Sequence, residues 1–227
     1  MSDPPLNVPY WASMYRVYEE DNDQYVQALA ESDLVERARR LWKWKDLSRS
    51  IDFAEIAPVI AQLDMDRYLD QRPSAAVQDV RDRLREEDVI SGSGLVTPSF
   101  LLHLAASGPE ASSATFPIYD RRVWNAYVYL WGVRGEENRL FRAASQSPEQ
   151  YGEFCQAFRD TCPDDRPRRY EQALFMFGGY IMDLTADDKP TPIETIDRVL
   201  SEQEQAIELA REHAGFAMVD VDTVVTR

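Results

Sequence analysis

Asp120 is the carboxylate whose position in this sequence most suggests chemistry. It closes the segment 116–120, Phe-Pro-Ile-Tyr-Asp, and comes directly before a helix that apolar spacing predicts over residues 121–131. A fixed carboxylate can stabilise a developing positive charge and can take a proton from water. Aspartate is also a preferred helix N-cap. The sequence leaves open whether Asp120 only caps its helix or also acts as a charged group in a site.

The turn Gly92-Ser93-Gly94 is a second stretch that could bind a ligand. Glycine lets another backbone approach closely, and the N–H groups of such a turn at the start of a helix can hold a phosphate. The helix expected next, residues 97–106, is apolar on almost every side and is predicted to be buried, with His103 as an interior histidine. The two glycines could instead simply end one helix and begin another.

Composition sets the class of protein and argues against several kinds of site. Of the 227 residues 44% are apolar, and nine glycines are too few for a sandwich or barrel full of tight turns. Two cysteines and two histidines predict no disulfide framework and no metal site. The sequence contains neither a signal-peptide pattern nor an apolar run of about 18 residues, so the chain is predicted to be cytoplasmic without membrane contact.

Helix signals recur along the whole chain. Ser147-Pro148-Glu149-Gln150 is a capping box with proline at the first helical position, and a similar start at 191–194 precedes an acidic C-terminal helix predicted over 191–215. A further apolar stripe over 170–184 contains Gly178-Gly179, where close packing or a bend is expected because glycine costs a helix about 1 kcal/mol relative to alanine. The prediction is an all-α fold of about eight to ten helices in a single domain, 1–227, with two lobes left open.

The order of these features resembles the helix-hairpin-helix DNA glycosylase superfamily. That family has a hairpin of the form Leu-Pro-Gly-Val-Gly-x-Lys-Thr-Ala, an apolar helix, and then a catalytic aspartate just before another helix. Residues 90–98, Ile-Ser-Gly-Ser-Gly-Leu-Val-Thr-Pro, align with the hairpin without gaps, and Asp120 aligns with the catalytic aspartate after a longer loop. The segment 116–120 and the basic, aromatic helix after it also look like small bacterial proteins related to 8-oxoguanine DNA glycosylase. The wider resemblance covers residues 30–185, and it implies no cofactor.

The resemblance implies which residues would contact DNA and an extruded base. The expected contacts to the DNA backbone come from the hairpin and the following basic helix: Gly92, Ser93, Gly94, Val96, Thr97, Arg121 and Arg122. Residues 121–142 carry five arginines (121, 122, 134, 139 and 142) against two glutamates, which is local positive charge of the kind such a site needs. Weaker candidates for a base pocket are the aromatic residues Trp42, Phe175, Phe177 and Tyr180. Core packing is the more common role for aromatic residues in apolar stripes.

Two departures from the family pattern separate the functional hypotheses. Val96 holds the position of the family's Schiff-base lysine, and valine cannot attack a sugar as an amine. Lys43 and Lys45 are far away in sequence, and no pattern brings either to that position. The net charge of −15 also opposes a phosphate backbone.

The first hypothesis is therefore at most a monofunctional DNA glycosylase, of repair or defence, in which Asp120 stabilises the cationic sugar and activates water. The alternative is a catalytically inactive glycosylase fold that binds a nucleic-acid end or, through its acidic surface, a protein partner. A cavity shared by Asp120, the arginines and the hairpin would support these two hypotheses. An Asp120 that only caps its helix under a lid of side chains would favour an unrelated helical protein.

Overall fold

The computed structural model describes residues 6–108, 112–132, 139–140, 143–163, 166–184 and 191–214. Within these ranges the chain forms eleven α-helices, two 3-10 helices and one antiparallel pair of two-residue strands. The all-α prediction is confirmed, and the number of helices is close to the one expected. None of the described helices is long and apolar enough to cross a membrane.

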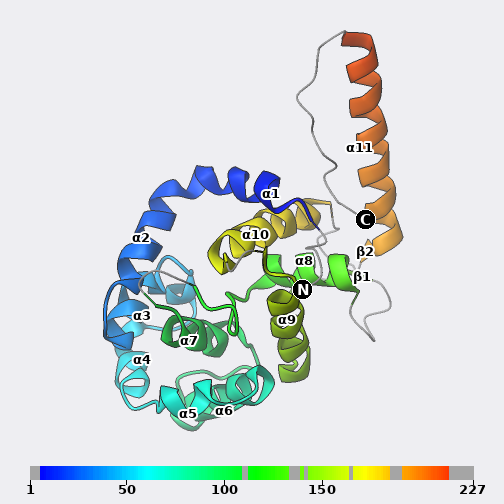
Figure 1. Ribbon diagram of the computed structural model, residues 1–227. Coiled ribbons are helices and arrows are strands. Elements are labelled where there is room, and N and C mark those ends of the chain that lie inside the picture. Colours follow the sequence, from blue (N-terminus) through cyan, green and yellow to red (C-terminus); the bar gives the residue numbers. More distant parts are fainter. Residues whose placement is uncertain are drawn as a thin grey trace.

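The N-terminal part contains the elements α1 (Val8–Met14), η1 (Tyr15–Tyr18), α2 (Glu19–Leu29), α3 (Leu34–Trp42), η2 (Leu47–Arg49), α4 (Phe53–Ile60), α5 (Met65–Leu69), α6 (Pro73–Glu86) and α7 (Val96–Ala106). The remainder contains α8 (Arg121–Trp131), β1 (Arg139–Leu140), α9 (Pro148–Thr161), α10 (Pro167–Asp183), β2 (Thr191–Pro192) and α11 (Ile193–Ala214). In Figure 1 helices α1 to α5 form an arc around α7, while α8 and α10 run together beside it.

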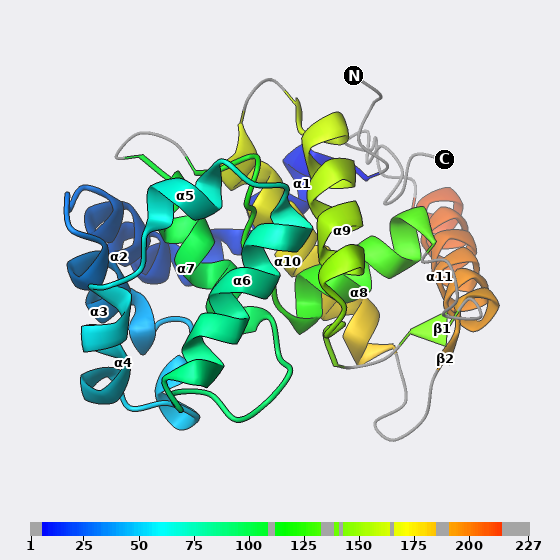
Figure 2. The same ribbon diagram turned by 90° about the horizontal axis from the view of Figure 1, so that it is seen from below.

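Helix α7 lies at the centre of the molecule, as its sequence predicts. It packs against α3, α5 and α6, and Phe100, Leu101, Leu102 and Leu104 are fully buried. Seen from below, α6 and α9 lie side by side on one face (Figure 2). The buried apolar side chains from Leu6 to Leu200 form one cluster that extends through all of these helices.

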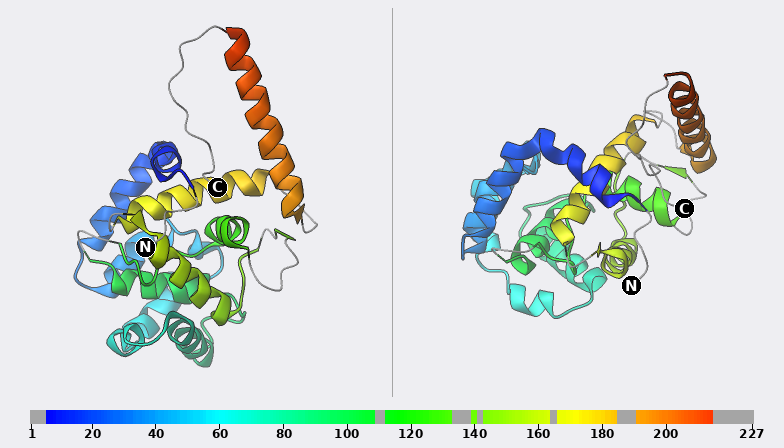
Figure 3. Two further views of the ribbon diagram at one scale, coloured as in Figure 1. Left: turned by 45° about the vertical axis from the view of Figure 1, so that its right-hand side comes forward. Right: turned by 45° about the horizontal axis from the view of Figure 1, so that its top comes forward.

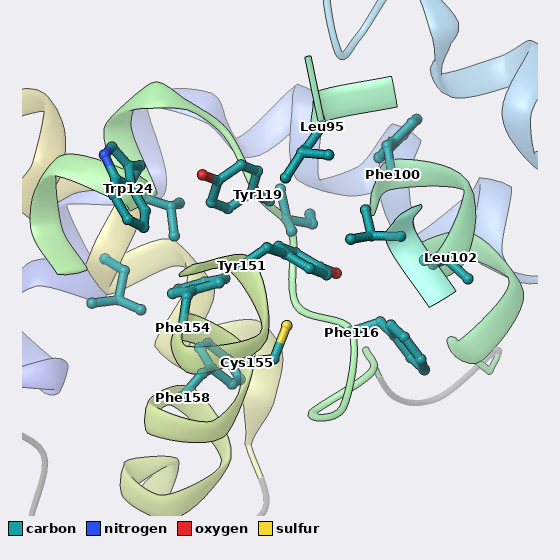
Figure 4. Close-up of a cluster of buried hydrophobic side chains, with 14 of the residues drawn as sticks. Leu95, Phe100, Leu102, Phe116, Tyr119, Trp124, Tyr151, Phe154, Cys155 and Phe158 are labelled. Carbon is teal, nitrogen blue, oxygen red and sulfur yellow. The ribbon is translucent and has the colours of Figure 1, made fainter. Parts of the chain in front are cut away.

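The segment just before α8 is fixed by aromatic packing. Tyr119 is fully buried, and its ring lies between Trp124 of α8 and Tyr151 of α9 (Figure 4), with ring centroids 6.0 and 5.2 Å away. Its hydroxyl donates to the carbonyl of Ser145 at 3.0 Å. Because this packing prevents the Tyr119 side chain from rotating, the backbone of the next residue, Asp120, is held in place.

Helices α8 and α10 touch each other through a glycine. A Cβ placed at Gly178 would lie 1.9 Å from the carbonyl oxygen of Arg122, whereas one at Gly179 would be 3.7 Å from the Arg122 side chain. The close packing expected at Gly178-Gly179 is therefore present, and it brings the first turn of α8 directly onto α10. The start of α8 is the part of that helix nearest to Asp120.

Helix α11 begins against the domain and then extends away from it (Figures 1 and 3). Ile196 and Leu200 near its start are buried, and Asp197 accepts a hydrogen bond from the Tyr129 hydroxyl at 2.7 Å. The predicted helix over 191–215 is thus present, beginning at Ile193 and described to Ala214.

Candidate functional site

A cavity of about 740 Å³ lies where the turn after α3, the start of α7, the start of α8 and the middle of α10 meet. This volume is within the range of small-molecule and cofactor sites. Asp120 lines it, so it is called the Asp120 cavity here. Val96, Thr97, Arg121 and Arg122 line it as well. The structure thus gathers in one cavity the aspartate, two of the arginines and the two residues of the predicted hairpin motif that begin α7.

Asp120 caps its helix and faces the cavity at the same time. Its Oδ1 accepts hydrogen bonds from the backbone N–H groups of Arg122 at 2.9 Å and Val123 at 3.0 Å. Its Oδ2 accepts from Lys45 Nζ at 2.7 Å. The side chain is 17% exposed. One carboxylate oxygen thus caps α8, and the other pairs with Lys45 at the cavity.

The surroundings of Asp120 keep it ionised. Burial by itself would raise the pKa of this carboxyl, but the Lys45 ammonium and the N–H groups of Val123 and Arg122 outweigh burial. The net result is a pKa below the usual 3.8. A charged carboxylate is therefore available in the cavity at neutral pH.

Lys45 is the site residue that sequence reasoning missed. No sequence pattern placed Lys43 or Lys45 at the lysine position of the motif, and the structure brings Lys45 to Asp120 instead. The chain turns after α3, with Asp46 in the left-handed region at φ 61°, and carries the Lys45 amine across to Asp120. The Lys45 side chain is only 8% exposed. Val96, which aligns with the lysine of the glycosylase hairpin motif, lines the same cavity. The amine in this cavity is therefore that of Lys45, from the turn after α3.

Cationic side chains outnumber carboxyl groups around the cavity. Its cationic lining consists of Lys45, Arg49, Arg121, Arg122 and Arg168. Its carboxyl groups are Asp46, Asp120 and Glu171. In a chain with a net charge of −15, positive charge is thus concentrated where a phosphate could approach. Arg134 and Arg142 lie outside the described residues, and of Arg139 the structure describes the backbone alone.

The predicted hairpin joins α6 to α7 as an exposed loop beside the cavity. Gly92, Ser93 and Gly94 are exposed and do not line the cavity. Neither glycine has a positive φ. A Cβ at Gly94 would meet no atom within 4 Å, and one at Gly92 would meet only the Gly94 nitrogen at 3.9 Å. Hence neither the backbone conformation nor packing inside the protein requires glycine at these two positions.

Of the four aromatic residues predicted for a base pocket, only Phe175 lines the Asp120 cavity. The guanidinium of Arg122 lies over its ring, 4.4 Å from the centroid. Phe177 is two residues further along α10, about 200° around the helix, and is fully buried. Trp44 lines the cavity together with Tyr15 and Tyr18.

Trp42 and Tyr180 lie elsewhere. Trp42 is buried, donates its indole N–H to the Ile51 carbonyl at 2.9 Å and packs edge-on against Phe53. Tyr180 contacts the ring of Trp11 and donates to Gln203. With Phe177, these two residues belong to packing between helices, because their helical phase turns them away from the cavity.

Glu171 on α10 is a second cavity residue that the sequence analysis did not select. It is 3% exposed, and its Oε1 accepts a hydrogen bond from the Ile118 N–H at 2.9 Å. Burial raises its pKa to about 7, although Arg168, the Ile118 N–H and Lys45 act in the opposite direction. Its spacing from Leu174 and Gly178 puts it on a buried stripe of α10, a signal that the sequence did contain.

His103 has the interior role that the sequence predicts. It is fully buried, with Nδ1 2.7 Å from the Phe116 carbonyl and Nε2 2.7 Å from the Tyr25 hydroxyl. Burial lowers its pKa to about 3, so it is neutral. Among the described residues, no cluster of three or more His, Cys, Asp and Glu side chains could hold a metal ion.

Comparison with protein-family models, curated proteins and solved structures gives no match for this chain.

Proposed function

We propose that this protein is a DNA-glycosylase-like enzyme that cleaves the N-glycosidic bond of a base extruded from DNA. The observation that carries the proposal is the pair of Asp120 and Lys45, joined at 2.7 Å in a cavity rich in cationic side chains. An extruded base with its sugar needs an enclosed site of this size. The motif resemblance over residues 90–98 and Asp120 supports the same activity.

Asp120 would stabilise the sugar as the bond breaks. The electron pair of the C1′–N bond leaves with the base, so positive charge develops on the sugar. A carboxylate already held in place by two N–H groups and a lysine costs no reorganisation when that charge appears. In the monofunctional route, water then attacks C1′ and gives its proton to Asp120.

The position of Lys45 supports a second route. A primary amine can attack C1′ in place of water as the bond to the base breaks. The C1′–O4′ bond of the sugar ring then opens to give a Schiff base, after which strand cleavage can follow. In the ion pair the nitrogen carries its proton and cannot attack, so the proton would first pass to Asp120. The sequence-based limit to a monofunctional enzyme depended on Val96 and on the lack of any pattern that places Lys43 or Lys45 in the site. The contact between Lys45 and Asp120 supports considering the second route as well.

The exposed turn at Gly92 and Gly94 would hold the DNA backbone. Since no contact within the protein requires glycine there, the open space beside the turn suits a phosphate approaching its N–H groups. Arg121 and Arg122 would add charge contacts from the start of α8. Phe175 and Trp44 offer rings on which an extruded base could stack.

A strand-cleavage assay tests the proposal. The protein is incubated with duplexes and single strands that each carry one modified base, with and without hot alkali, which breaks strands at abasic sites. Asp120→Asn should abolish cleavage because asparagine can still cap the helix but carries no charge. Asp33→Asn is the matched control, since Asp33 caps α3 through Glu36 N–H at 2.9 Å far from the cavity residues.

The cleavage pattern also separates the two routes. Alkali-dependent cleavage means hydrolysis by water. Cleavage without alkali, together with a covalent adduct trapped by borohydride and lost in Lys45→Gln, means attack by the amine. The exposed Lys43 provides the control Lys43→Gln. If folded protein cleaves none of the substrates, the proposal is wrong and the non-catalytic interaction module takes its place.

A further inference from the structure

Glu171 has a carboxylate oxygen without a hydrogen-bond partner. Its Oε2 is shielded from solvent and accepts no hydrogen bond, although the residue lines the Asp120 cavity. The nearest cation is Arg168, whose Nη1 is 3.7 Å from Oε2, beyond hydrogen-bonding distance. A buried polar atom left in this way costs roughly 1–3 kcal/mol. Such a cost in a cavity wall points to a partner that arrives with a ligand.

The histidine next to Glu171 does not donate a hydrogen bond to it. His103 of α7 lies with Nδ1 3.5 Å from Oε1, but that nitrogen hydrogen-bonds the Phe116 carbonyl. A carbonyl can only accept, so Nδ1 carries the proton and Nε2 accepts from the Tyr25 hydroxyl. The neutral His103 therefore donates its single proton elsewhere. The charges that face Glu171 are Arg168 on its own helix and Lys45 from the turn after α3.

The pKa values of Asp120 and Glu171 are shifted in opposite directions. The pKa of Asp120 lies below its usual value because of Lys45 and two backbone N–H groups that overcome its burial. Burial raises the pKa of Glu171 to about 7. One carboxyl is thus ionised at neutral pH while the other still holds its proton about half of the time. Two carboxyl groups whose pKa values differ in this way are suited to act as a base and an acid in one reaction.

The two carboxyl groups are also close enough to act on one nucleoside. Glu171 is hydrogen-bonded to the N–H of Ile118, which is two residues ahead of Asp120. Two residues of chain span at most about 7 Å. A sugar placed at Asp120 can therefore have its base at the α10 wall. Phe175, one turn beyond Glu171 and on the same face of α10, lines that wall as well.

We infer that Glu171 is the general acid of the reaction, which gives its proton to the departing base. The inference depends on the proposed function. As the C1′–N bond breaks, its electron pair moves onto the base, the Glu171 proton neutralises the base, and Glu171 becomes a carboxylate that solvent reprotonates after release. The substrate class follows: an uncharged base that would leave as an anion without a proton, with a ring nitrogen or carbonyl oxygen facing α10.

The test is the pH dependence of single-turnover excision, measured on the base that the cleavage panel identifies. In the wild type the rate should fall above about pH 7, by about tenfold per pH unit, as Glu171 loses its proton. Glu171→Gln keeps an oxygen that can accept from Ile118 N–H but has no acidic proton. It should be about 100-fold slower at pH 6 and lack this decline. The exposed Glu153 on α9 supplies the control Glu153→Gln, which should match the wild type.

Several outcomes overturn the inference. If Glu171→Gln is slower by the same factor at every pH, with the decline intact, Glu171 has only a structural role. A wild-type rate with no decline near pH 7 also refutes it, whatever the variant does. If Glu171→Gln does not fold, Glu171→Asp is the second variant. It keeps an acidic proton, and its excision rate should therefore still decline as pH rises. A wild type that excises no base at all refutes the proposed function instead.

Discussion

Replacing Gly178 by alanine puts a methyl group where α10 meets the first turn of α8. The new Cβ would lie 1.9 Å from the carbonyl oxygen of Arg122, a separation under 3.0 Å that real Cβ atoms essentially never show. The obstacle is backbone and cannot rotate away, so one of the two helices must move. The N–H of the same residue, Arg122, holds Asp120 Oδ1, and a shift of α8 therefore moves the carboxylate as well.

The size of the effect follows from two opposing contributions. In an unobstructed helix, glycine to alanine stabilises by about 1 kcal/mol. Overpacking a tight contact costs about 1–3 kcal/mol and occasionally more. Gly178→Ala should therefore lower the free energy of unfolding by up to about 2 kcal/mol despite its better helix propensity.

Gly179→Ala is the matched control for Gly178→Ala. Its Cβ would be 3.7 Å from the Arg122 side chain, an ordinary contact, and it should stabilise by up to about 1 kcal/mol. Urea denaturation of both variants measures the difference, and the cleavage assay reports whether Asp120 has moved. If the two variants unfold at the same urea concentration, the close contact between α8 and α10 is wrong.

Three further predictions concern the cavity and the turn beside it. Lys45→Met should lower the free energy of unfolding by about 3 kcal/mol at pH 7, because it leaves Asp120 charged without its cation. The pKa of Asp120 is depressed in the folded protein, so this stabilising contribution exists above pH 3.8 and is lost at lower pH. Gly92→Ala and Gly94→Ala should leave thermal stability unchanged or slightly higher yet weaken binding to a duplex in a fluorescence anisotropy titration. The pKa of Glu171 is raised from 4.5 to about 7 in the folded protein, so the wild type loses stability as pH rises through that range. The stability of Glu171→Gln relative to the wild type should therefore increase between pH 4.5 and pH 7, by up to about 3 kcal/mol.

Each of these has a result that contradicts it. A Lys45→Met defect that is equally large at pH 7 and pH 3 would show that lost packing, and not the ion pair, is responsible. Duplex binding unchanged in both glycine variants would remove the hairpin from the proposed DNA contacts. A stability difference between Glu171→Gln and the wild type that does not vary with pH would mean that the Glu171 carboxyl is not held in its neutral form.

Local signals predicted much of the fold. Ser147 caps α9 as predicted, with its side chain accepting from the Gln150 N–H at 3.3 Å. The reciprocal half of the capping box is not formed, because the Ser147 N–H donates to Ser145 Oγ at 3.1 Å. Asp120 caps α8 as its residue type and position indicate. The apolar character of α7 correctly predicted burial. The adjacent glycines of α10 indicated a close contact or a bend, and a close contact is present at Gly178. Such features are determined within one helix, where spacing and capping preferences act over a few residues.

Contacts between distant segments were beyond reach of the same reasoning. Lys45 and Asp120 are 75 residues apart. Lys45 lies in the turn after α3, next to Asp46 with its left-handed φ, a conformation that aspartate adopts only in some contexts. The aromatic residues illustrate a related difficulty. Choosing between Phe175 and Phe177 requires knowing which side of α10 faces the cavity. The apolar face of α10 is too wide to specify this side.

Because one oxygen of Asp120 caps α8, the orientation of its carboxylate in the cavity depends on the first turn of that helix. Oδ1 stays oriented only while the amides of Arg122 and Val123 point at it, which requires that first turn to be formed. Fraying of α8 at its beginning would let the carboxylate swing free while the rest of the molecule remains folded. On heating, activity should therefore be lost below the melting temperature of the whole protein. Hydrogen exchange at the amides of Arg122 and Val123 should accelerate over the same temperature range as the loss of activity.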